Sequence, residues 1–234
     1  MKKIVTSYQF NMFVKSMPIT PSPDMVGRLF TELGALGLFP GIGNEIGPNG
    51  QQIQFFRLAT HDDKISINFN TFALCISYND LDSKDSSVAL AFVEQAYQAL
   101  NKLGVVFFGN RLSIVVNKVN DVEKHEVDVH LNKFITDKIR ADECIEWDSR
   151  AVVRKKMGIS NEIVNIVNAV RFTKASIPTV NAGRPFDAVL FDYDINTLLE
   201  SDAYRFDTNN AIEVFSEMLG FIGENVFEQV WNGN

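Results

Sequence analysis

Alternation of apolar and polar residues with a period of two recurs along the chain, and this pattern constrains the fold most strongly. Between residues 4 and 14, one side carries Ile4, Thr6, Tyr8, Phe10, Met12 and Val14, while Gln9 and Asn11 lie on the other. Successive side chains of a strand point to opposite faces, so this segment predicts a half-buried strand. The same alternation at 65–69 and 72–78, around a turn at 70–71, predicts an antiparallel hairpin.

Further strand-like runs lie at 105–119, 144–147, 151–157, 163–172 and 188–195. Helical spacing of apolar residues predicts three helices between these runs. The first starts at Ser22 and Pro23, and the second runs from Ser86 or Ser87 to Leu103. The third runs from Asp207 or Thr208 to Trp231. The segment 40–50 holds four glycines and two prolines, which predicts a loop.

This order of elements favours an α+β fold of antiparallel sheets with crossing amphipathic helices. Segments 65–102 and 187–229 share the order strand, acidic connection and amphipathic helix, which predicts a duplication into two similar lobes. We place the lobes at 1–122 and 123–234, packed together, because KVNDVEKHE around the boundary is a short polar linker.

The charge of the chain is acidic and unevenly distributed. There are 22 Lys and Arg against 29 Asp and Glu, which gives a net charge of -7 and a pI near 5.0. Residues 187–234 hold ten acidic residues and one basic residue. Such a surface repels phosphates and attracts basic partners, so a protein partner is expected and nucleic acid is disfavoured. Alternatively, these acidic residues form a solvated helix face that maintains solubility.

The ends and apolar runs of the chain exclude other classes. No apolar run is long enough for a membrane span. The opening MKKIVTSYQF lacks the apolar stretch of a secretory signal, so a cytoplasmic protein without membrane contact is expected. Cys75 and Cys144 are isolated in apolar settings, which predicts buried, inert thiols. We expect no cofactor and no catalytic residue, and we lean against an enzyme.

Three groups of residues are candidate sites. The acidic final helix, with Glu213, Glu217, Glu224 and Glu228, is the predicted protein-interaction surface. Asp192 and Asp194 lie two apart on a predicted strand and would need a third ligand to hold a divalent cation; alternatively they mark its solvent side. The basic run of Arg150, Arg154, Lys155 and Lys156 is the candidate phosphate contact, although it lacks an RNA-binding signature.

Several stretches of the chain carry a resemblance to known sequences. They are TSYQFNMFV, FFGNRLSIVVNKV, AVLFDYDI and NNAIEVFSEMLGFIGENVFEQV. In their order they resemble a sporadically distributed family of uncharacterised bacterial proteins of similar length. The resemblance implies no activity and no site residues. The patchy occurrence of that family implies an accessory gene from a mobile or defence-related locus.

The sequence therefore leads to one hypothesis and two alternatives. The leading hypothesis is a non-catalytic bacterial accessory protein that binds another protein and self-associates as a homo-oligomer. The first alternative is a metal-dependent hydrolase or nuclease that uses Asp192 and Asp194. The second is a nucleic-acid-binding module that uses the run from Arg150 to Lys156.

Overall fold

A computed structural model describes residues 1–47, 49–80, 85–131, 133–134, 145–178, 180–199, 203–224 and 226–232. Its strands are β1 (Lys2–Val14), β2 (Phe39–Ile46), β3 (Gln52–Ala59), β4 (Ile65–Asn70), β5 (Ala73–Asp80), β6 (Gly109–Asp121), β7 (Trp147–Lys156), β8 (Ile163–Ala175) and β9 (Phe186–Thr197). Its α-helices are α1 (Pro23–Leu33), α2 (Ser86–Lys102), α3 (Lys124–Leu131), α4 (Asn210–Gly220) and α5 (Val226–Asn232).

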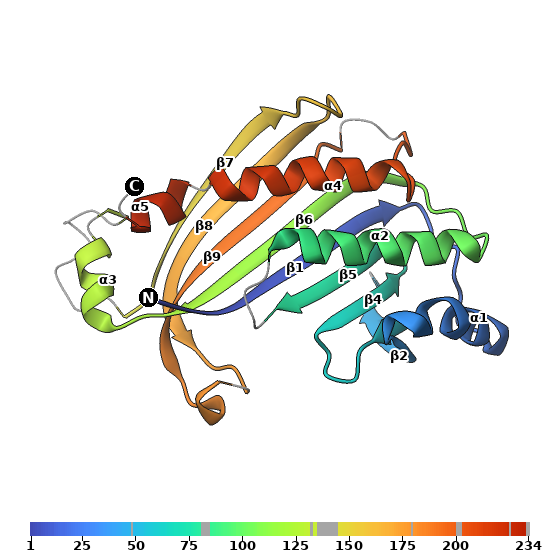
Figure 1. The fold of residues 1–234 in the computed structure, drawn as a ribbon, viewed down its shortest axis with the longest axis horizontal. Helices are drawn as coiled ribbons and strands as arrows, with labels where there is room; N and C mark the ends of the chain where they lie inside the picture. The colour runs from blue at the N-terminus through green and yellow to red at the C-terminus, as the bar shows by residue number, and fades with distance from the viewer. Residues whose placement is uncertain are drawn as a thin grey trace.

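All the described strands join one antiparallel sheet, in the order β2-β3-β4-β5-β1-β6-β9-β8-β7 (Figure 1). The expected α+β fold of antiparallel sheets with crossing amphipathic helices is therefore wrong, because the described strands form a single sheet. The molecule is mainly one large nine-stranded sheet with shorter helices.

The union of the two predicted lobes rests on the pairing of β1 with β6. Tyr8 lies opposite Val116, and Phe10 lies opposite Ile114, in a ladder that extends over most of both strands. Strand β6 then pairs with β9 on its other side. The two halves contribute strands outward from this centre in matching order, β1-β5-β4-β3 and β6-β9-β8-β7. The predicted boundary after residue 122 follows β6 directly, where both sides belong to the same sheet.

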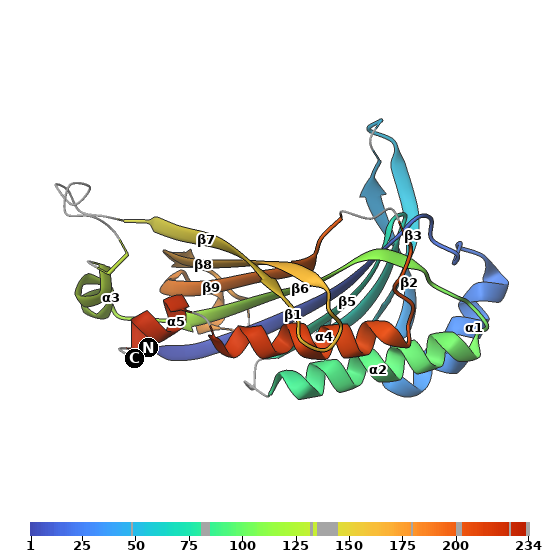
Figure 2. The same cartoon turned by 90° about the horizontal axis from the view of Figure 1, so that it is seen from above.

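The helices lie on one side of the sheet, and the sheet curves away from them toward β3 (Figure 2). The alternation of the opening segment explains why that side is the core: Tyr8, Phe10 and Met12 are buried beneath the helices. The ring of Phe10 packs edge-on against Phe215 of α4, with 5.3 Å between ring centroids. This confirms the predicted half-buried strand.

The opposite face of the sheet, which we call the open face because the described helices lie on the other side, has a polar row along its centre whose inner members are buried. Cross-strand pairing aligns Asn68, Cys75, Asn11, Ser113, Asn196 and Asn165 in a single row. The Asn11 amide donates a hydrogen bond to Ser113 Oγ at 3.0 Å. Burial raises the pKa of the Cys75 thiol to about 11, which keeps it protonated and unreactive. Cys144 lies outside the described residues.

The predicted loop at 40–50 is wrong in its first half, because β2 runs through it as an edge strand paired with β3. A glycine here can be required by the limited space beside a neighbouring side chain as well as by a turn. A Cβ on Gly43 would lie 2.4 Å from the Phe55 ring of β3, so only glycine fits against that ring as it stands. Gly43 therefore reflects close packing between the two strands.

The predicted second helix is confirmed at both ends as α2, and the first helix is confirmed at its start. Ser22 caps α1 by accepting the Met25 N–H, and Pro23 opens the helix as expected. The continuous final helix is wrong: α4 ends at Gly220, a short 3₁₀ turn follows at Phe221–Glu224, and α5 begins at Val226. The hairpin at β4 and β5 and the runs at 163–172 and 188–195 are confirmed. The run at 151–157 belongs to the single strand β7, which begins at Trp147, and the run at 105–119 becomes strand only from Gly109. Among the described residues, every helix is too short or too polar to cross a membrane.

Candidate functional site

A groove of about 760 Å³ lies between α2 and α4, on the side of the sheet that the helices cover. The two helices run side by side across the sheet (Figure 1). They are joined near one end of the groove by Asn101, whose Oδ1 accepts the Thr208 hydroxyl at 2.6 Å. The Asn101 amide also donates to Asn209 Oδ1 at 3.4 Å. These bonds fix the spacing of the helices at that end. We call this feature the α2–α4 groove.

The α2–α4 groove combines an apolar lining with acidic side chains. Leu90 of α2 and Ile212 of α4 contribute apolar surface, and the buried Tyr97 of α2 lies beneath them. Ile159, from the turn between β7 and β8, adds a side chain that is 68% exposed. Three glutamates, Glu94, Glu213 and Glu217, also line the groove. Within the described part of the chain, no lysine, arginine or histidine lines it, so its local charge is negative.

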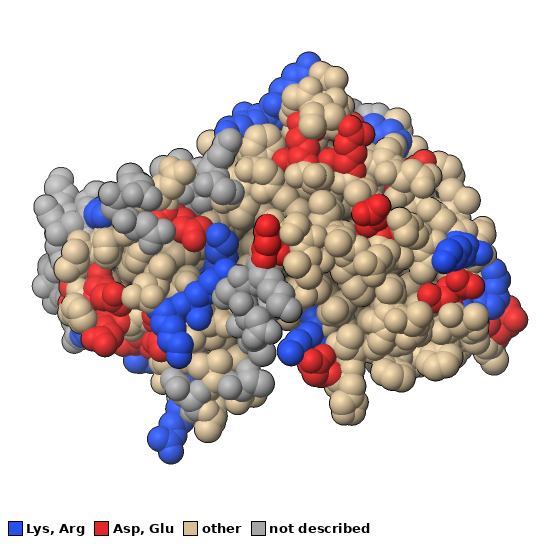
Figure 3. Space-filling model, in the orientation of Figure 1, with Lys and Arg blue, Asp and Glu red and all other residues tan. Residues whose placement is uncertain are grey.

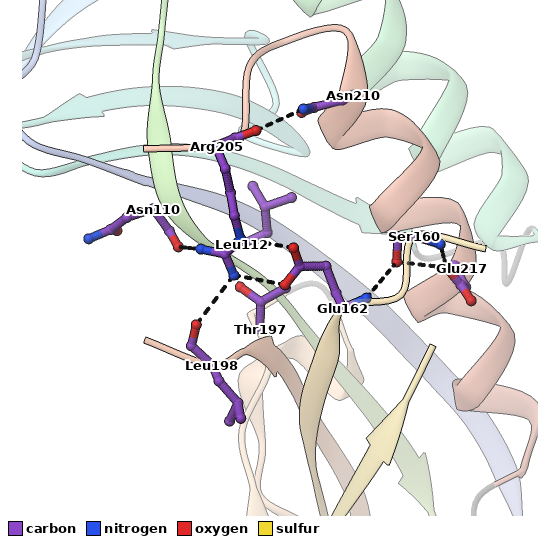
Figure 4. A network of polar contacts seen from close by, with 9 residues as sticks. All are labelled: Asn110, Leu112, Ser160, Glu162, Thr197, Leu198, Arg205, Asn210 and Glu217. Atoms are coloured by element: carbon purple, nitrogen blue, oxygen red, sulfur yellow. Dashed lines mark hydrogen bonds and ion pairs between the residues drawn. The ribbon is translucent and has the colours of Figure 1, made fainter. Parts of the chain in front are cut away.

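Glu217 has a structural role, because it holds the turn between β7 and β8 against α4. Its carboxylate accepts the N–H groups of Gly158, Ile159 at 2.9 Å and Ser160 at 3.0 Å. It also accepts the Ser160 hydroxyl, and Figure 4 shows the two contacts with Ser160. Burial alone would raise the pKa of this carboxyl, but the hydrogen bonds outweigh it and hold the pKa below 4.5. The turn that presents Ile159 to the groove is thus fastened to α4.

A second polar anchor lies beside this turn. Arg205 donates two hydrogen bonds to Glu162, at 2.8 and 2.7 Å, and a third to the Asn110 carbonyl at 2.8 Å (Figure 4). The paired Glu162 carboxylate raises the pKa of the Arg205 guanidinium. Bidentate Arg–carboxylate pairs are geometrically specific. This pair ties the segment before α4 to the start of β8 and of β6.

The predicted acidic surface on the final helix is not one continuous surface. Glu213 is exposed beside the α2–α4 groove, and Glu217 is engaged with the turn. Glu228 accepts Lys118 Nζ at 2.7 Å and the Tyr193 hydroxyl. The side chain of Glu224 lies outside the described residues. Figure 3 shows acidic and basic residues interspersed over the helix-covered face. Two of the four predicted carboxylates therefore hold the fold together.

Asp192 and Asp194 share the open face of β9, as the sequence predicts. Asp192 pairs with Arg171 of β8 at 2.9 Å. Asp194 accepts the Asn196 amide at 3.1 Å. Across the described residues, no group of three or more His, Cys, Asp or Glu is placed to hold a metal ion. The structure therefore brings an arginine, rather than a third carboxylate, to the pair.

The basic run lies on β7, the outermost strand on one side of the sheet. Strand alternation places Arg150, Arg154 and Lys156 on the open face and Lys155 on the other. Lys155 Nζ lies 5.2 Å from the centre of the Phe221 ring, consistent with its position on the helix side. The run is thus split between two faces, and its open-face members follow one sheet edge.

Comparison with known proteins provides no family for this chain. No family model, curated protein or solved structure matches it. The candidate site consequently rests on its own geometry.

Sequence reasoning identified Glu213 and Glu217 but missed their partners in the groove. Glu94 has no distinctive motif around it, and its place opposite α4 follows only from the packing of the two helices. One available signal was the helical spacing of Leu90 and Tyr97, which marks an apolar face of α2 without showing which element packs against it.

Proposed function

We propose that the protein is a non-catalytic interaction protein that binds a basic amphipathic helix of a partner in the α2–α4 groove. The observation that carries the proposal is the combination in one groove of an apolar lining and three carboxylates, without a lysine, arginine or histidine among the described lining residues.

Helix recognition of this kind uses apolar anchors spaced three or four residues apart, which enter a groove between elements of the receptor. Leu90, Ile212 and Ile159 are available to contact such anchors. Lysine or arginine side chains beside the anchors would then reach Glu94 and Glu213 on the two helices. Because the Glu217 carboxylate is already hydrogen-bonded to its turn, it would contribute mainly to the negative electrostatic potential and to the shape of the groove.

The charge of the whole molecule supports the same class of partner. A net charge of -7 accelerates the approach of a cationic segment and disfavours an anionic one. Paired charges at the edge of an interface affect association rate and specificity more than affinity. We therefore expect selectivity for basic helices that weakens with added salt.

Fluorescence anisotropy can test this with a labelled amphipathic peptide of leucine and lysine, about 18 residues or 27 Å long. The matched probe has glutamate in place of each lysine. We expect saturable binding of the lysine peptide only, reduced about tenfold by Glu94→Lys or Glu213→Lys, a loss of about 1.4 kcal/mol. Asp128→Lys, on exposed α3, makes the same charge change away from the groove and is the control.

Three outcomes would contradict the proposal. They are no binding of the lysine peptide at low salt, equal binding of both peptides, and equal losses in the groove variants and in Asp128→Lys. The last result would show attraction to the net charge alone. Leu90→Asp distinguishes the apolar contribution to peptide binding from the electrostatic one. It should abolish binding although it makes the groove more acidic.

A further inference from the structure

The outer edge of β2 is an open strand edge with exposed apolar side chains. In the order of the described strands, none lies beyond β2 on that side of the sheet. Ile42 is 50% exposed and Ile46 is 81% exposed. Phe30 of α1 and Phe39 at the start of β2 are also exposed, and their ring centroids lie 6.4 Å apart. Unpaired backbone groups flanked by apolar side chains form a template for another strand.

The ladder between β2 and β3 determines which backbone groups face outward. The Gly47 N–H bonds to the Gln51 carbonyl at 2.8 Å, so the odd-numbered residues of β2 form the hydrogen-bonded pairs with β3. The N–H and C=O groups of Ile42, Asn44 and Ile46 therefore point away from β3. Pro40 is also an outward position and has no N–H to donate, which fits the occurrence of proline on edge strands.

We propose that a second copy of this chain pairs with β2, antiparallel and about a two-fold axis at Asn44. This register places Asn44 opposite its symmetry mate and Ile42 opposite Ile46 of the other copy. It uses all three outward N–H groups between residues 42 and 46, and both apolar pairs fall on one face.

The charges on β2 also suit a second copy. Glu45 is its charged residue, and the carboxylate accepts the Thr71 N–H at 3.0 Å and the Thr71 hydroxyl. In the proposed register Glu45 faces Gly43 of the other copy. Moving the axis to Glu45 would place two carboxylates directly opposite each other, which is unfavourable. The two-fold axis at Asn44 avoids that contact and buries the isoleucines together.

Disulfide formation across the axis tests the register in the full chain. Asn44→Cys, in a background with Cys75→Ser and Cys144→Ser, would meet its symmetry mate at a Cα separation of about 5.5 Å. This lies within the range that a disulfide spans. Gln54 of β3 lies opposite Asn44 but one strand further in. Gln54→Cys is thus the matched control, and we expect Asn44→Cys to cross-link at least tenfold faster.

Light scattering on the wild-type chain should give twice the 26.3 kDa mass of the monomer. Ile42→Lys combined with Ile46→Lys places cations opposite each other and should raise the dissociation constant at least tenfold. A wild-type monomer at every concentration up to about 1 mM would overturn the proposal. So would a dimer in which both cysteine variants cross-link at equal rates. The cross-linking result holds whether or not the lysine variant folds.

Discussion

The two edge strands of the sheet, β7 and β2, differ in whether their side chains discourage pairing with another strand. Strand β7 carries Arg150, Arg154, Lys155 and Lys156, whereas β2 presents glycines and exposed isoleucines. Charged side chains, lysine above all, protect an edge because a second strand would bring like charges together. The basic run thus has a structural explanation that requires no phosphate, and the comparison leaves β2 as the edge suited to pairing.

The edges also differ in how they are anchored. The turn that follows β7 is fastened by Glu217 to α4 and, through Glu162, to Arg205. On the other side, Glu45 links β2 to the turn between β4 and β5. Both edges are therefore anchored to the rest of the fold, and the basic side chains of β7 are what distinguish it from β2. Four substitutions, or groups of substitutions, test this difference, beginning with the largest expected effect.

Removing the charges on the open face of β7 should make the two edges alike. In Arg150→Thr combined with Arg154→Thr and Lys156→Thr, we expect assemblies larger than the dimer, because both edges of each copy then pair. Light scattering across a concentration series measures this. The control, Lys2→Thr with Lys15→Thr and Lys102→Thr, makes the same change in net charge away from β7. Growth in the control as well would attribute the effect to net charge alone.

Breaking the anchor beside β7 should cost stability. Glu162→Gln removes the carboxylate from Arg205, whose side chain is only 28% exposed, and we expect a loss of about 1–3 kcal/mol in the free energy of unfolding. Urea denaturation measures it. Asp63→Asn is the comparison, since its pair with Arg57 is exposed and should contribute less than about 1 kcal/mol. Equal losses would contradict the assigned role of Arg205.

Alanine substitutions at Gly43 and Gly41 of β2 should differ in their effect on stability. Gly43→Ala forces the Phe55 ring to move, and we expect destabilisation of about 1 kcal/mol and weaker self-association. At Gly41 the nearest atom to an added Cβ is the Arg57 carbonyl oxygen, at 3.7 Å. Gly41→Ala should therefore be neutral in thermal denaturation, and a matching loss there would argue against ring contact as the cause.

The smallest expected effect concerns pH at the β7 turn. The Glu217 pKa in the folded state lies below its ordinary 4.5, so its contribution to stability is full above that value. It is lost as the pH falls below 4.5 and passes through the folded pKa. Glu217→Gln should thus be less stable than wild type near pH 7, and the difference should shrink on acidification. A difference that stays constant between pH 7 and pH 3 would exclude this linkage.

The local elements were largely predictable, whereas their assembly was not. Period-two alternation identifies β1 and the hairpin of β4 and β5 because one face of each strand is buried. It cannot show that β1 pairs with β6 about a hundred residues later, and so it could not distinguish one sheet from two lobes. Strand β2 was missed because its glycines and prolines also suit a loop.

The candidate site was predictable only in part for the same reason. Glu213 and Glu217 stand out in an acidic segment, but the partners of Glu217 are backbone N–H groups of a distant turn. A backbone donor has no sequence signature. Similarly, Glu94 gains its role from α4 lying beside α2. Pairings across long sequence distances decide these roles, and a single sequence does not encode them in any local pattern.

The central position of β1 has a consequence for how the chain is made. This strand is synthesised before both of its neighbours in the sheet, β5 and β6. At about 5–20 residues per second, translation of the roughly hundred residues up to β6 takes about 5–20 s. During that interval the nascent apolar strand lacks its second neighbour. The pairing that joins the two halves of the sheet can therefore form only after most of the first half has been synthesised.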